Sequence, residues 1–165
     1  MSSIFRDIFK VIARFFENRT RYRFALLCIL GIFAASDFLI SGLARRTFVF
    51  YTINDNRTIV ENRNIAKSKS RELNISRYVD EAILGPVTPD VLPLFQKGTR
   101  LLSLLYRDGL VYVNFSEDAA LPPEEGGELF KNLNTLYNGI KRNFSYVSDI
   151  YFFIGGKEAF SGAFR

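Results

Sequence analysis

Apolar residues follow three different patterns along the chain. Residues 24–44, FALLCILGIFAASDFLISGLA, form a nearly continuous apolar run that contains one acidic side chain, Asp37. A helix needs about 20 mainly apolar residues to cross the hydrocarbon core of a bilayer. Later segments show either the alternation typical of strands or the spacing of three and four typical of helices. The pattern predicts a transmembrane helix over residues 24–44 and a folded domain over residues 45–165.

Residues 1–23 are predicted to be a cytoplasmic, amphipathic juxtamembrane segment. Their apolar positions recur at helical spacing and basic residues lie elsewhere on the wheel, as in helices that lie on a membrane surface. Before the apolar run there are six Lys and Arg residues and two acidic ones. The positive-inside rule therefore predicts that the N-terminus stays in the cytoplasm and that the folded domain is exported. A cleaved signal peptide is the alternative, because Gly42 and Ala44 have small side chains at a cleavage spacing.

The patterns in residues 45–165 predict five strands and two helices. Two hairpins are expected, around the turn residues 54–56 and around Asp108–Gly109, which suits a type I′ turn. The first helix ends at Gly85–Pro86, and the second opens at Pro122–Pro123 with acidic residues at its positive end. The predicted fold is α+β: a single sheet with two helices, in the order β-β-α-β-β-α-β, preceded by one transmembrane helix.

Two of the predicted strands, residues 110–115 and 150–154, are apolar on both faces. Alternate side chains of a strand point to opposite faces, and two helices can cover only one face of the sheet. The second face is therefore either offered to a partner or covered by the ends of the chain, and the segment after Gly156 is the candidate cover, with Ala159, Phe160 and Phe164. The predicted interaction surface comprises Leu110, Tyr112, Tyr151 and Phe153.

Composition excludes several kinds of chemistry. Cys28 is the single cysteine and the chain has no histidine, which excludes an internal disulfide, Ser-His and Cys-His nucleophiles and the common zinc sites. No cofactor or metal is expected. Beyond residue 44 the chain has 16 Lys and Arg residues and 14 Asp and Glu residues. Because this balance gives no concentrated basic face, nucleic acid is not an expected partner.

An enzyme would have to use carboxylates. Paired acids can serve as general acid and base in glycan cleavage, and the candidates are Asp118, Glu124, Glu125 and Glu128. Acidic residues in the first turn of a helix are explained more simply by the helix dipole, and no second acidic cluster opposes them. The sequence therefore predicts a protein that is not an enzyme.

Several motifs occur together in an order that resembles one bacterial family, the GerMN (sporulation and spore germination) domain, over residues 46–160. Asn114 departs from the family pattern because Asp is usual there, and Gly155 replaces an Asp that is common before glycine. Residues 140–146 are also longer than expected. The motifs are Leu84-Gly85-Pro86, Gly98-Thr99, Asp108-Gly109, Val111 to Ser116, Asn134-Thr135-Leu136 and Ile150 to Lys157.

The resemblance implies a non-catalytic, extracytoplasmic module, with similarity to domains that build rings in membranes, and it supplies no catalytic residues. The expected function is a membrane-anchored interaction or assembly module of the bacterial cell envelope. Its expected partners are membrane lipid and either another envelope protein or a second copy of itself. The alternative is a module that binds cell-wall glycan (peptidoglycan) or a small ligand. The expected location is the cytoplasmic membrane, with the C-terminal domain outside the cytoplasm.

Overall fold

The computed structural model describes residues 19–40, 42–52, 57–123, 128–160, 162 and 164. The chain divides into two compact units, Met1–Gly42 and Leu43–Arg165. Of the predicted amphipathic segment over residues 1–23, residues 1–18 lie outside the described residues and residues 19–23 are helical.

The described part of the first unit is one helix, α2 (Arg19–Ile40). Apolar side chains are exposed around its circumference, among them Phe24, Leu27, Leu30 and Phe33. Within residues 19–40 and the other described segments, no helix has the length and apolar character needed to cross a membrane.

The predicted transmembrane helix over residues 24–44 is therefore not found. Arg23 and Asp37 bound only 13 uncharged residues, whereas a span needs about 20. Leu43 and Ala44, which the prediction placed in the span, are the first residues of a strand. They belong to the second unit.

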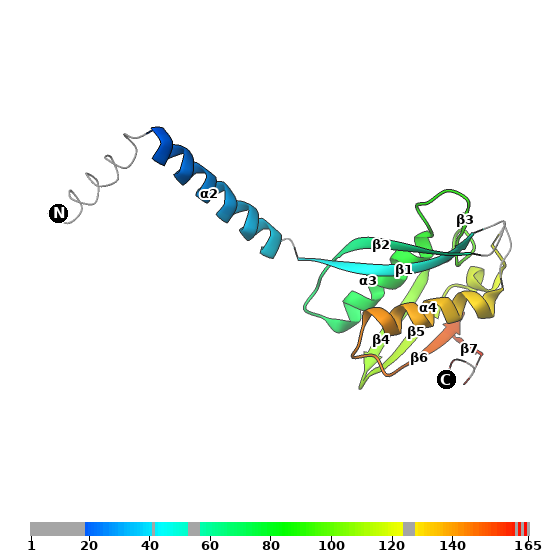
Figure 1. The fold of residues 1–165 in the computed structure, drawn as a ribbon. Helices are drawn as coiled ribbons and strands as arrows, with labels where there is room; N and C mark the ends of the chain where they lie inside the picture. The colour runs from blue at the N-terminus through cyan, green and yellow to red at the C-terminus, as the bar shows by residue number, and fades with distance from the viewer. Residues whose placement is uncertain are drawn as a thin grey trace. The chain divides into compact units, whose positions relative to one another are not determined.

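The second unit contains two sheets rather than the single predicted sheet (Figure 1). The first has the strand order β2-β1-β3, with β1 at Leu43–Thr52, β2 at Thr58–Ala66 and β3 at Val91–Leu92. The second has the order β4-β5-β6-β7 and comprises β4 (Leu101–Arg107), β5 (Leu110–Phe115), β6 (Asp149–Ile154) and β7 (Lys157–Ala159). Only the β5–β6 pair is parallel among these strands. The fold is α+β as predicted, but the predicted element order is wrong because it lacks β3 and β7.

Helix α3 (Arg71–Leu84) has the ends that its sequence favours. The Ser70 hydroxyl accepts a hydrogen bond from the Leu73 N–H at 3.2 Å, and Gly85 ends the helix at a φ of 81°. These are common devices for closing the two ends of a helix. The predicted end of α3 at Gly85 is confirmed.

Helix α4 (Leu129–Asn143) begins later than predicted. Pro122 and Pro123 are not helical, and a short 3-10 helix, η1 (Glu117–Ala120), lies before them. Two glycines precede Glu128 in the sequence, and glycine costs about 1 kcal/mol relative to alanine inside a helix. The apolar stripe of α4 therefore becomes helical only from Leu129.

Both helices lie between the two sheets (Figure 1). On α3, the Tyr78 hydroxyl donates to the Thr47 carbonyl of β1, and the Glu72 carboxylate accepts from the Tyr106 N–H of β4. On α4, Asn143 bonds to Thr47 and the Tyr137 hydroxyl donates to Asp149 of β6. Each helix is therefore fixed to both sheets.

The core fills the space between these layers. Phe48 of β1 stacks on Tyr78 of α3 with ring centroids 4.4 Å apart, and Phe144 meets Tyr78 edge-on. Val111, Val113 and Phe115 of β5 are fully buried against the helices. The helices thus cover one face of the four-stranded sheet.

Candidate interaction surface

The four-stranded sheet turns one face away from both helices. Along β5, Val111, Val113 and Phe115 are fully buried, whereas Leu110 and Tyr112 are half-buried on the opposite side. This alternation follows from the period of two in a strand. The face away from the helices is apolar at both positions.

Strand β6 continues this face. Ile150 and Phe152 are buried on the helix side, whereas Tyr151 and Phe153 are half-buried on the other. The structure therefore places all four residues of the predicted interaction surface on one face of one sheet. Their role in binding stays a prediction.

The parallel register of β5 and β6 brings the two tyrosines together. Tyr112 lies directly beside Tyr151, and Asn114 lies beside Phe153. The tyrosine rings are stacked, with centroids 5.3 Å apart and an angle of 14° between their planes. The stacking holds the two rings in one geometry, and aromatic pairs add about 0.5–1.5 kcal/mol beyond the area that they bury.

Strand β4 adds one apolar residue that the sequence did not single out. Leu105 pairs with Tyr112 across β4 and β5, and 53% of its surface is exposed. We call the set Leu105, Leu110, Tyr112, Tyr151 and Phe153 the outer face. It extends over three neighbouring strands, and its most exposed member is the one beside the tyrosine pair.

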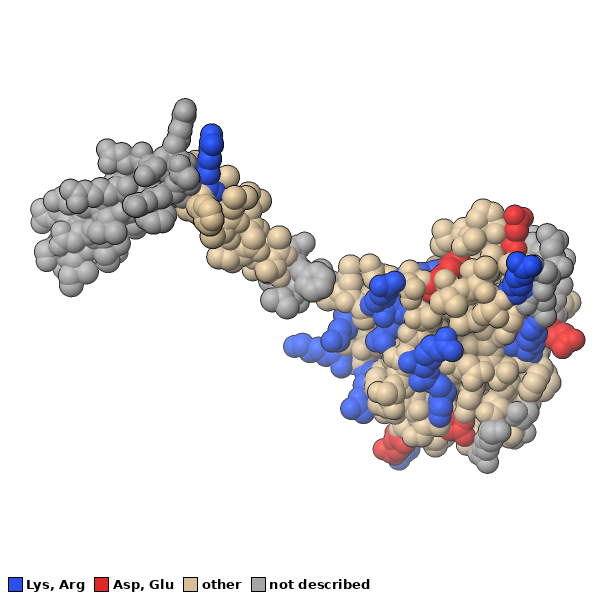
Figure 2. All heavy atoms as spheres, in the orientation of Figure 1, with Lys and Arg blue, Asp and Glu red and all other residues tan. Residues whose placement is uncertain are grey.

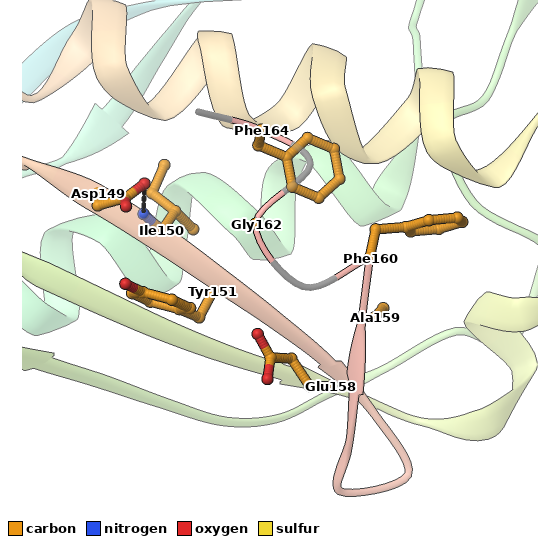
Figure 3. Close-up of a pocket in the computed structure, with 8 residues that line it drawn as sticks. All are labelled: Asp149, Ile150, Tyr151, Glu158, Ala159, Phe160, Gly162 and Phe164. Atoms are coloured by element: carbon orange, nitrogen blue, oxygen red, sulfur yellow. Dashed lines mark hydrogen bonds between the residues drawn. The ribbon is translucent and has the colours of Figure 1, made fainter.

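The C-terminal segment does not cover the outer face in the part that the structure describes. Phe164 packs edge-on against Phe152, which points toward the helices, and stacks on Tyr137 and Phe130 of α4. In Figure 3 Phe164 lies on the helix side of β6, whereas Tyr151 points away from it. The predicted alternative, in which Ala159, Phe160 and Phe164 cover the opposite face, is therefore wrong for Phe164.

A small hollow opens at the edge of β6 beside the end of β7 (Figure 3). Its volume is about 10 Å³, which is at the lower limit for a single water molecule. The carboxylate of Asp149, which lines it, accepts hydrogen bonds from the Ile150 N–H and the Tyr137 hydroxyl. The hollow is too small for a sugar or a cofactor. Its lining residues are Asp149, Ile150, Tyr151, Glu158, Ala159, Phe160, Gly162 and Phe164.

Of the four acidic residues that an enzyme would need, the structure describes Asp118 and Glu128. Asp118 lies in η1 and accepts a hydrogen bond from the Ser116 hydroxyl, while Glu128 is exposed just before α4. Glu124 and Glu125 lie outside the described residues. Among the described residues, no group of three or more His, Cys, Asp or Glu side chains could hold a metal ion.

Comparison with known proteins agrees with this architecture. The family model described as "Germane: Sporulation and spore germination" matches residues 49–160, which is more than half of the chain. The chain belongs to the Germane (GerMN) family. The predicted resemblance is confirmed, and the conclusion concerns residues 49–160. No curated protein matches the chain.

Solved GerMN structures share the fold. The first GerMN domain of the sporulation protein GerM from Bacillus subtilis aligns with a TM-score of 0.55 and 16% identity, over 70% of this chain and 86% of that one. The tandem GerMN domains of the same protein align with a TM-score of 0.52 and 17% identity, over 72% of this chain. This chain spans only 41% of that tandem structure. At these identities the likeness shows the fold alone.

A third solved structure is a putative lipoprotein from Clostridium perfringens. It aligns with a TM-score of 0.45 and 19% identity, over 72% of this chain and 78% of that one.

Within this GerMN chain, Asn114 departs from the family pattern but has a local role, since its side-chain oxygen accepts the Gly156 N–H at 3.0 Å. It ties the end of β5 to the turn between β6 and β7.

Proposed function

We propose that this GerMN chain is a non-catalytic assembly module of the bacterial cell envelope, which binds a protein partner or a second copy of itself through the outer face. The observation that carries the proposal is the stacked pair Tyr112–Tyr151, flanked by the half-exposed Leu105. Tyrosine is enriched where protein interfaces are energetically strong, because it contributes a large rigid surface at low entropic cost. The GerMN fold supports the proposal only because it holds these residues together on one sheet; it does not identify the partner.

The proposal includes association with a lipid membrane through the N-terminal unit, and a position of the Leu43–Arg165 unit outside the cytoplasm. Its support is the apolar circumference of α2, where Phe24 and Phe33 are 70% and 73% exposed. Such a helix is stable only in apolar surroundings.

Site-specific photocrosslinking in intact cells of the native host tests the interface. A photoreactive residue at position 105 should give a discrete adduct with a protein, whereas one at position 60 should not. Leu105 and Val60 are similarly exposed, at 53% and 54%, but Val60 lies on β2 in the other sheet. Adducts of equal yield at both positions would contradict the proposal.

Cell-wall glycan is the second candidate ligand, because stacked tyrosines can also hold the apolar face of a sugar ring. Co-sedimentation of the full chain with insoluble peptidoglycan discriminates between the two functions. Glycan binding requires that the pelleted fraction exceed that of serum albumin and that it fall when Tyr151 is changed to Ala. We expect neither result, because the described hollow beside the outer face holds at most one water molecule.

A further inference from the structure

Lys and Arg side chains gather at the end of the second unit at which β1 begins (Figure 2). Strand β1 starts at Leu43, which pairs with Ala66 at the end of β2. Lys67 and Lys69 follow directly on β2, and Arg45 lies two residues into β1. Three basic residues from two segments therefore share this end of the fold.

The C-terminal end of α4 lies at the same end. The Asn143 carbonyl accepts a hydrogen bond from Arg46 at 2.6 Å, and the Asn143 side-chain oxygen accepts one from the Thr47 N–H at 3.0 Å. The guanidinium of Arg46 also stacks on the Phe144 ring at 4.3 Å. These contacts hold Arg142, the residue before Asn143, beside the first half of β1.

Four of these cations have no internal partner. Arg45, Lys67, Lys69 and Arg142 are exposed, and none of their side chains forms a hydrogen bond or ion pair with a residue that the structure describes. We call these four residues the basic end. Their charges are available to a ligand, in contrast to Arg46, which already bonds within the fold.

Nearby acidic residues do not neutralise the basic end. The Glu72 carboxylate, at the start of α3, turns inward and accepts the Tyr106 N–H at 3.0 Å. Asp108, at the β4–β5 turn, forms an ion pair with its neighbour Arg107 at 3.6 Å. The numbers of acidic and basic residues in the whole unit are nearly equal, yet four exposed cations share this end. Sequence counts could not show this.

We propose that the basic end binds the anionic headgroups of a phospholipid surface. Charge complementarity is the first support, and the second is Leu43, an apolar side chain 54% exposed among the cations. Basic and apolar side chains presented together are typical of surfaces that adsorb to anionic membranes. The third support is the short linker: only Ser41 and Gly42 separate the apolar helix α2 from Leu43 in the sequence, so a membrane-bound α2 would keep Leu43 near the membrane surface. The inference rests on the proposed membrane association of α2.

The expected strength follows from the number of charges. Each Lys or Arg near an anionic membrane surface raises the partition coefficient about fivefold, and the gain is lost at high salt because the Debye length shortens. Removing three charges of the basic end should therefore reduce binding to anionic vesicles by more than tenfold. Binding of the apolar helix to neutral vesicles should stay unchanged.

The test is sedimentation of the full chain with vesicles of neutral phosphatidylcholine, with and without about one third phosphatidylglycerol. The basic-end variant carries Arg45→Gln, Lys67→Gln and Lys69→Gln. Its matched control carries Lys97→Gln, Arg100→Gln and Lys157→Gln, which remove three exposed charges from the segment before β4 and from β7, in the four-stranded sheet. Both variants lose the same net charge, so a difference between them reports position.

We expect the ratio of binding on anionic to neutral vesicles to fall more than tenfold in the basic-end variant and less than about threefold in the control. Equal losses in the two variants would overturn the inference. So would a result in which a DNA duplex displaces the wild-type chain from the vesicles and this displacement depends on the same three residues. The neutral vesicles report separately on α2. Failure to bind them would contradict the proposed membrane association itself.

Discussion

The hydroxyl group of Tyr78 on α3 fills the space beside Gly139 of α4 that a Cβ atom would need. The tyrosine cannot move aside easily, because its hydroxyl donates to the Thr47 carbonyl at 3.0 Å and its ring stacks on Phe48. Burial raises the pKa of Tyr78 well above its ordinary value, so the hydroxyl keeps its proton across the physiological range. One side chain thus links both helices to β1.

Gly139→Ala is expected to destabilise the fold, although alanine is normally the better helix residue. The added methyl group would force Tyr78 out of its position, at a cost of about 1–3 kcal/mol in the free energy of unfolding. Urea titration followed by near-ultraviolet circular dichroism measures this, since the chain has no tryptophan.

The double variant Gly139→Ala, Tyr78→Phe is the control for this mechanism. Removing the hydroxyl opens the space, so the second substitution should recover most of the loss caused by the first, minus about 1 kcal/mol for the lost hydrogen bond. A loss in the double variant equal to the sum of the losses in the two single variants would show that the contact between Tyr78 and position 139 does not matter.

The carboxylate of Glu61 joins β2 to the loop after α3. It accepts hydrogen bonds from Arg63 at 2.6 Å and from the Thr88 N–H and hydroxyl at 3.0 and 2.8 Å. Burial raises the pKa of Glu61, but the bonds from Arg63, Thr88 and Val87 outweigh it and lower the pKa to about 2. Because the folded pKa is depressed, the stabilisation is present above the ordinary value of 4.5 and is lost as pH falls toward 2.

Glu61→Gln should therefore lower the free energy of unfolding at pH 7 by about 2–3 kcal/mol and should flatten its decline between pH 4.5 and 2. Urea titrations across this range measure both effects. Glu117→Gln, which changes an exposed carboxylate, is the comparison and should leave the profile as in the wild type. A Glu61→Gln profile parallel to the wild type would contradict the assignment.

Val113 and Leu133 are completely buried, and an aspartate at either position would place an unpaired carboxylate between β5 and α4. The cost is several kcal/mol, comparable to the stability of a whole domain. Val113→Asp and Leu133→Asp should each abolish cooperative unfolding, measured by circular dichroism. Val60→Asp, at a position 54% exposed, should change the stability by no more than about 0.5 kcal/mol.

The elements that could be predicted are those with a strong local pattern. Strand β5 follows the Asp108–Gly109 turn and alternates over its whole length, and α3 has both its cap and its glycine stop. Strands β3 and β7 have two and three residues, too few for any periodicity. The division into two sheets depends on which strands pair across the core, and no local pattern records it.

The outer face shows the same limit. Alternation placed Tyr112 and Tyr151 on the same side of the sheet, but only the parallel register of β5 and β6 makes them neighbours. Leu105 was missed because apolar residues stand next to each other in β4 on both sides of Ser103, so no alternation in the sequence marks one face. The positions of Arg45 and Arg142 at one end depend on the packing of α4 on β1.

Crosslinking of outer-face variants in intact cells is the most direct test of the central claim. Tyr112→Lys and Tyr151→Glu, made separately, each place a charge in the aromatic pair without touching the core, so both variants should fold. We expect the adduct formed from position 105 to disappear in both variants and to persist in Val60→Lys, the control on β2. An unchanged adduct in both folded tyrosine variants would contradict the claim that the outer face is the interface.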